Sequence, residues 1–226
     1  MSLKNTHEDK TFASVLADGK IHVSVPEGTE GALKREYETS DGKVGSKYEF
    51  VYTELAGMIT KIEFHEGDFG KSLNLTVVDG DEKPVVLTLS TASNFGEDMM
   101  KKLLNIDMDL PVILAPYSFV DDKGKNKRGI TVTQEGKKIQ NYFYDFHKKV
   151  NINGYPEPKK SKKPLSKDQW KMYFMEARMF LIDTITEHFK LEETVDSKDK
   201  ALDNYGKDIE PEDIDMDAPA PKKGKK

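Results

Sequence analysis

The chain of 226 residues contains no cysteine, only one tryptophan and no apolar run near the ~20 residues that cross a bilayer. Without cysteine there is no disulfide scaffold, no thiolate zinc site and no cysteine nucleophile. The first residues also lack the apolar segment of a secretory signal. Hydrophobic residues make up 36% of the chain, which predicts a small core or an unfolded segment. We therefore expect a cytoplasmic protein without a membrane partner.

Motifs that would indicate an enzyme or a metal site are also missing. The residues around Lys71 end like a phosphate loop, but His65 stands where that motif needs glycine. Residues 213–224 begin like a calcium loop and then lack its glycine and its final glutamate. The histidines show no ligand spacing, and no serine lies in a Gly-x-Ser-x-Gly turn. We expect a binding protein that uses no cofactor. A recombination or repair enzyme with a carboxylate site is an alternative.

Positive charge is concentrated in one part of the chain. Residues 123–163 carry 12 basic and 3 acidic side chains, a net charge of +9, although the whole chain has a net charge of −5. Such an excess is typical of a surface that binds a polyanion. Rings are interleaved with these lysines, namely Tyr142, Phe143, Tyr144, Phe146 and His147. Charge for phosphates and flat rings for unstacked bases are what single-stranded nucleic acid requires, whereas a merely solvated lysine-rich surface is the alternative.

Residues 49–145 have the most regular pattern. Alternating apolar residues predict strands at 49–64, 71–78, 84–90, 111–120 and 129–133. Residues 94–104 have helical spacing instead, and Pro116 predicts an edge position or a bulge. Three strands, a helix and two strands is the order of the oligonucleotide/oligosaccharide-binding (OB) fold. We therefore expect a mainly β chain whose core is an OB-fold-like five-stranded antiparallel barrel.

Four further segments flank this barrel. Residues 1–48 are expected to form a strand or hairpin extension, with turns at Asp18-Gly19 and Asp41-Gly42. A basic linker (146–165) precedes a long amphipathic helix (166–190), which we expect to pack on the barrel, on a partner or on a second copy of the chain. Residues 191–226 have too few large apolar groups for a core, which predicts a disordered acidic tail.

The barrel order, the lysine-rich loop between its last two strands and the acidic tail together resemble the single-stranded DNA-binding proteins of bacteriophages. Segments 69–73, 116–119 and 141–143 carry this likeness within the barrel. The resemblance implies sequence-independent coating and protection of single-stranded DNA during phage replication, recombination or repair in the host cytoplasm. It also implies that the acidic tail competes with DNA and recruits replication or recombination proteins. The tail residues are Asp208, Glu210, Glu212, Asp213, Asp215 and Asp217.

Two sets of residues are candidates for contacts with the strand. The expected phosphate contacts are Lys123, Lys125, Lys127, Arg128, Lys137, Lys138 and Lys71, the first four in or beside a glycine-containing loop that could close over a strand. The expected stacking residues are Phe69, Tyr117, Phe119, Tyr142 and Tyr144. The competing interpretation buries these rings in the core. The chain would then be a structural, assembly or protein-interaction module that docks through helix 166–190 and binds no nucleic acid.

Overall fold

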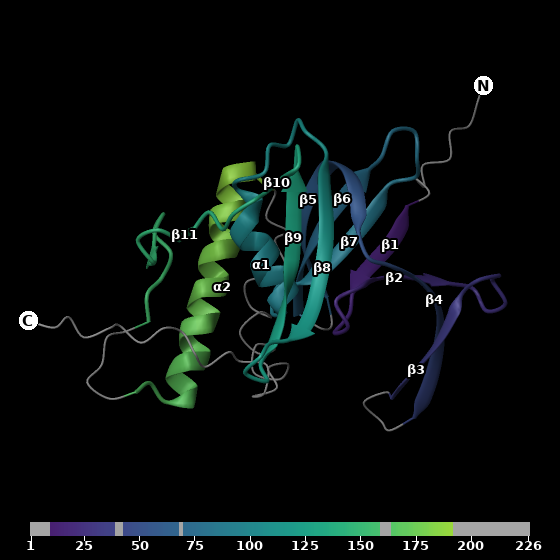
Figure 1. Cartoon of the computed structure of the whole chain (residues 1–226), viewed down its shortest axis with the longest axis horizontal. Coiled ribbons are helices and arrows are strands. Elements are labelled where there is room, and N and C mark those ends of the chain that lie inside the picture. The colour runs from purple at the N-terminus through teal and green to yellow at the C-terminus, as the bar shows by residue number, and fades with distance from the viewer. Residues whose placement is uncertain (1–9, 39–42, 68–69, 159–163, 192–226) are drawn as a thin grey trace, which may run out of the picture.

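The structure is a computed structural model that describes residues 10–38, 43–67, 70–158 and 164–191. Its elements are β1 (Thr11–Val15), β2 (Ile21–Val25), β3 (Leu33–Glu38), β4 (Val44–Tyr52), β5 (Leu55–Gly67), β6 (Gly70–Val78), β7 (Val85–Ser90), α1 (Asn94–Leu103), β8 (Val112–Val120), β9 (Asn126–Gln134), β10 (Lys137–Lys138), β11 (Tyr144–Asp145), β12 (Val150–Asn151) and α2 (Lys167–Phe189). The prediction of a mainly β chain with a C-terminal helix is confirmed (Figure 1).

One mixed sheet of ten strands takes the place of the expected closed five-stranded barrel. The strand order is β10-β9-β8-β5-β6-β7-β1-β2-β4-β3, and β11 and β12 form a separate pair. All neighbours in the large sheet are antiparallel except β1 and β7, which are parallel. Closing the expected barrel would require β9 to pair with the free edge of β7. Strand β1 already pairs with that edge, so the sheet stays open. Strands β1 to β4, which lie where a strand or hairpin extension was predicted, are therefore part of the same sheet.

Strand β5 connects the two halves of this sheet by a bend. Its residues 55–57 pair with β8, and its residues 58–67 pair with β6. At the junction, Gly57 has a φ of 144°, and a Cβ there would lie 2.6 Å from the carbonyl oxygen of Val78. A bulge follows between Ile59 and Lys61. Because a bulge shifts the alternation by one residue, Ile59 and Ile62 are both buried.

The core lies on one face of the sheet, where α1 packs against it (Figure 1). The helix begins at Ser93, whose hydroxyl accepts a hydrogen bond from the backbone of Gly96. Gly96 permits close contact, since a Cβ there would lie 2.0 Å from the carbonyl oxygen of Ser90. The fully buried side chains of α1 and its neighbouring strands include Met99, Met100, Leu103, Leu73, Leu75, Leu87, Leu114 and Ile130. The opposite face is called the outer face below.

Two side chains of α1 form hydrogen bonds with the backbone of β9, on the edge that faces away from β8. In a closed barrel this edge would pair with another strand. The Asp98 carboxylate accepts a hydrogen bond of 2.8 Å from the Ile130 N–H, and the Lys102 ammonium donates one of 2.6 Å to the Ile130 carbonyl. Asp98 and Lys102 also form an ion pair at 2.7 Å. Because backbone groups that lose water need partners, this pair stabilises an edge that none of the described strands covers at Ile130.

Helix α2 packs beside α1 and completes the core (Figure 1). It begins at a capping box, in which Ser166 and Gln169 each bind the other's backbone N–H. Leu181, Ile182 and Ile185 are buried in the core cluster. Neither described helix is long and apolar enough to cross a membrane.

A two-stranded ribbon, formed by β3 and residues 44–49 of β4, extends away from the rest of the sheet (Figure 1). Strand β2 pairs only with residues 48–52 of β4, so β3 is the only described strand that pairs with residues 44–47. Both faces of the ribbon carry exposed side chains, among them Leu33 and Val44. We call this element the β3–β4 ribbon.

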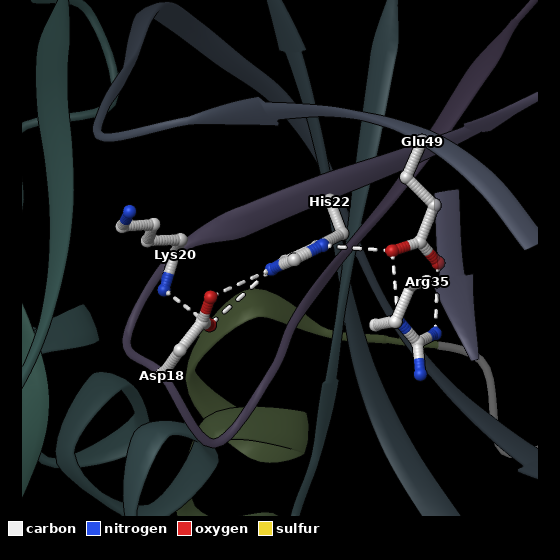
Figure 2. Close-up of polar contacts among 5 residues, drawn as sticks. All are labelled: Asp18, Lys20, His22, Arg35 and Glu49. Carbon is white, nitrogen blue, oxygen red and sulfur yellow. Dashed lines mark hydrogen bonds and ion pairs between the residues drawn. The ribbon is translucent and has the colours of Figure 1, made fainter. Parts of the chain in front are cut away.

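A chain of polar contacts joins the β3–β4 ribbon to the turn between β1 and β2 (Figure 2). The His22 ring lies 2.9 Å from a carboxylate oxygen of Glu49 through Nδ1 and 3.1 Å from Asp18 through Nε2. Arg35 donates two hydrogen bonds of 2.8 Å to the two oxygens of Glu49. The Arg35 contact, which outweighs burial and is helped by His22, lowers the pKa of Glu49 to about 2.

The same turn packs directly against β8. Gly19 has a φ of 73°, as the predicted Asp18-Gly19 hairpin turn requires. A Cβ on Gly19 would lie only 2.3 Å from the backbone nitrogen of Ser118. The polar chain that begins at Asp18 therefore connects the ribbon to the end of β8.

The lowered pKa of Glu49 makes the folded state sensitive to acid. A carboxyl with a pKa near 4.5 when unfolded and about 2 when folded contributes about 3 kcal/mol above pH 5, and this contribution is lost as the pH falls toward 2. We expect Glu49→Gln to remove that part of the pH dependence when urea unfolding is measured from pH 7 to pH 2. Glu63→Gln is the control, because Glu63 forms only an exposed pair with Lys61. Equal pH dependence in the wild type and in Glu49→Gln would contradict the prediction.

Candidate nucleic-acid interface

Two aromatic rings and a lysine lie together on the outer face of the β8–β9 hairpin. Tyr117 and Phe119 are two residues apart on β8, and their ring centroids are 5.8 Å apart at an angle of 36°. Phe119 is 55% exposed and lies directly across the strands from Lys127. Sequence reasoning predicted that all three contact single-stranded DNA, and the structure brings them together. We call these three residues the Tyr117 surface.

A glycine on the neighbouring strand determines how Tyr117 lies. Tyr117 pairs with Gly129, and a Cβ at Gly129 would lie 2.6 Å from the phenol oxygen and 2.9 Å from the ring carbon that bears it. The ring therefore lies across Gly129, and its hydroxyl end reaches toward α1. Burial, together with the charge of Asp98, raises the pKa of Tyr117. The phenol thus stays neutral at physiological pH, and one ring face rests on the sheet.

The loop between β8 and β9 is a tight, internally bonded turn. One oxygen of the Asp121 carboxylate accepts hydrogen bonds from the backbone N–H groups of Lys123 and Lys125, each 2.9 Å long. These bonds hold the pKa of Asp121 below its usual range. Gly124, with a φ of 76°, closes the turn through its N–H bond to the Asp121 carbonyl. Hydrogen bonds therefore hold the backbone of the two lysines in place. Sequence reasoning described a loop that could close over a strand of DNA.

The remaining predicted phosphate contacts are spread over the molecule. Arg128 pairs with Ser118, on the face of β9 opposite to Lys127. Lys137 and Lys138 are exposed on β10, at the other end of β9 and about 20 Å from Lys127 along the strand. Among the predicted phosphate contacts that the structure describes, only Lys127 and the lysines of the adjoining loop therefore lie on the hairpin beside Tyr117 and Phe119.

Lys71 lies at the far end of β5 from the β8 pairing. It pairs with Glu66, whereas residues 55–57 of β5 pair with β8. Its ammonium lies 5.5 Å from the centroid of the Phe64 ring. The predicted stacking residue Phe69 lies outside the described residues, as do the tail residues Asp208, Glu210, Glu212, Asp213, Asp215 and Asp217.

Tyr142 and Tyr144 do not join the Tyr117 surface. The backbone N–H of Tyr142 donates to the Lys101 carbonyl of α1 at 2.8 Å, and its ring packs at the margin of the core beside Phe143. Tyr144 lies in the β11–β12 pair, against Phe146, beyond α2 as seen from the large sheet (Figure 1). The adjacency of these rings in the sequence therefore does not place them on one surface with Tyr117.

Sequence reasoning missed two residues near Tyr117, namely Gly129, against which its ring lies, and Asp98, whose charge contributes to its raised pKa. A glycine inside a strand is a recognised sign of close approach by another group, so Gly129 carried a usable signal. Asp98 carried none, because its contact with Ile130 spans 32 residues of sequence.

No group of three or more histidine, aspartate and glutamate residues in the described ranges is arranged to hold a metal ion. Comparisons with family models, curated proteins and solved structures found no match to this chain.

Substitution of Gly129 tests the packing of Tyr117. A valine at this position would displace the Tyr117 ring and the Asp98 carboxylate, both within 2.6 Å of the added Cβ. We expect Gly129→Val to lower the free energy of unfolding by about 1–3 kcal/mol in thermal or urea unfolding. Thr131→Val is the matched control, since it changes a β-branched residue on the same face of β9. If both variants unfold like the wild type, the ring does not rest on Gly129.

Proposed function

We propose that this protein binds single-stranded DNA without sequence preference, as a coating and protecting protein and not as an enzyme. The observation that carries the proposal is the Tyr117 surface, where the exposed Phe119 ring and the half-buried Tyr117 ring adjoin Lys127 and the loop that carries Lys123 and Lys125. Sequence-independent binding needs flat apolar partners for bases and positive charge for phosphates. This combination is present within one hairpin.

The geometry of the rings suits stacking better than a structural role alone. A phenylalanine that is 55% exposed contributes little to a core, whereas a base laid on it would remove apolar area from water. Tyr117 lies against Gly129 and beside Phe119, so the two rings form one aromatic surface. The tight loop holds Lys123 and Lys125 beside the rings, so little conformational entropy is lost when they meet phosphates.

The topology gives further support through the OB-fold. Strands β5, β6 and β7, helix α1, and strands β8 and β9 follow that order, and β5 pairs with both β6 and β8. In that fold the loops after the first and the fourth strand flank the nucleic-acid face. The corresponding loops here are residues 68–69, which lie outside the described ranges, and residues 121–125. We propose that this half of the open sheet is a variant of the OB-fold.

Salt dependence distinguishes the roles of the lysines and the rings. Each phosphate neutralised on a single strand contributes about −0.7 to the slope of log affinity against log salt. We expect the triple change of Lys123, Lys125 and Lys127 to alanine to flatten that slope by about 2, measured by fluorescence anisotropy with labelled oligo(dT). If the slope is unchanged, the loop lysines do not bind phosphates.

The contribution of the rings to DNA affinity should persist at high salt, where the contribution of the lysines is screened. We expect Phe119→Ala to lower affinity for oligo(dT) by about 1–3 kcal/mol at both low and high salt. Phe146→Ala is the matched control, because its ring is 56% exposed but lies in the segment before β12, beyond α2 (Figure 1). A failure of the wild-type chain to bind oligo(dT) in dilute buffer would refute the proposed function, and equal losses in the two variants would refute the assignment of the site.

A further inference from the structure

The β3–β4 ribbon carries a second tyrosine laid over a glycine between cations. Tyr37 pairs with Gly45, and a Cβ on Gly45 would lie 2.6 Å from the ring carbon that bears the hydroxyl. The Lys47 ammonium is 5.5 Å from the centroid of the Tyr37 ring, and the Arg35 guanidinium is 5.8 Å from it. We call Arg35, Tyr37 and Lys47 the Tyr37 surface.

Strand register sorts the side chains of this ribbon by type. Arg35 pairs with Lys47 and Tyr37 with Gly45, so all four lie on one face. The acidic side chains of β3 point to the opposite face, which carries Lys34, Glu36, Glu38 and Tyr48. Glu49 is the one carboxylate on the Tyr37 side of the pairing, and it is buried against Arg35 and His22. The exposed charge beside Tyr37 is therefore positive, although the ribbon as a whole is mixed.

This arrangement repeats that of the Tyr117 surface. In both places a tyrosine lies across a glycine of the adjacent antiparallel strand, and a lysine stands two residues from that glycine on the same face. The pairs are Tyr37 with Gly45 and Lys47, and Tyr117 with Gly129 and Lys127. Both surfaces belong to the outer face of the one large sheet.

The two surfaces are held in a fixed relation by the polar chain of Figure 2. Gly19 packs on the backbone at Ser118, next to Tyr117, and the contacts from Asp18 through His22 and Glu49 end at Arg35, which adjoins Tyr37. A ribbon that served only to extend the sheet would not need a buried carboxylate to orient it. A long ligand that contacts both surfaces binds more tightly when the two surfaces are already held in the right relative position.

We propose that the Tyr37 surface is a second contact for the same single strand of DNA, which passes from the Tyr117 surface over the turn between β1 and β2. This inference rests on the proposed function. A nucleic-acid strand fits better than an acidic protein, because the surface combines two cations with an aromatic ring, which suits the phosphates and bases of a single strand. Tyr37 stacks one base, and Lys47 binds an adjacent phosphate.

The test measures binding of the full chain to two lengths of oligo(dT). A strand of about 8 nucleotides falls within the site size of one OB-fold, and one of about 30 can reach both surfaces. The test variants are Tyr37→Leu and Lys47→Met. Lys34→Met is the matched control, because it removes a lysine from the opposite face of the same ribbon. Thermal unfolding of each variant checks that the ribbon remains folded.

We expect Tyr37→Leu to weaken binding of the long strand by roughly 5- to 100-fold and to leave the short strand at wild-type affinity. Lys47→Met should flatten the salt slope for the long strand by about 0.7, and Lys34→Met should leave it unchanged. Wild-type affinity of both test variants for the long strand would overturn the inference, as would an equal loss in Lys34→Met. If Phe119→Ala weakens binding while these variants do not, only this inference fails. If the wild type binds neither strand, the proposed function fails with it.

Discussion

The architecture depends on the need of strand edges to pair their backbone N–H and C=O groups. In this sheet the edge of β7 is paired by β1, and the edge of β9 at Ile130 is paired by the side chains of Asp98 and Lys102. With both edges satisfied, the sheet has no need to close on itself. It therefore remains open, and the N-terminal strands extend it toward the β3–β4 ribbon.

The open sheet explains why the candidate interface consists of exposed faces. On the outer face, two tyrosines each lie against a glycine of the next strand, and both rings are half-buried. A glycine in a strand lowers its intrinsic stability. Covering it with an aromatic ring offsets part of that loss. The same contact thus supports the sheet and holds the ring that we propose as a stacking partner for a base.

Local patterns in the sequence predicted much of the fold. The alternation in 71–78 and 84–90, the helical spacing in 94–104 and the turn at Gly19 all agree with the structure. The alternation predicted over 49–64 does not continue unbroken through β5, because the bulge before Lys61 shifts it and buries both Ile59 and Ile62. Strands β1 and β3 were predicted only through the hairpin turns at Asp18-Gly19 and Asp41-Gly42, without bounds of their own. Strand β3 has charged residues on both faces, so it lacks an apolar alternation.

By itself, the sequence determined most of the segments that form strands or helices and where positive charge and aromatic residues concentrate, because these properties depend on neighbouring residues. Only the tertiary structure decided which of them share a surface. Tyr117, Phe119 and Lys127 meet through the pairing of β8 with β9, whereas Tyr142 and Tyr144 turn away to α1 and the β11–β12 pair. Pairing and register are set by contacts between residues far apart in the chain, so a one-residue bulge or a parallel neighbour such as β1 changes them without leaving a local sign.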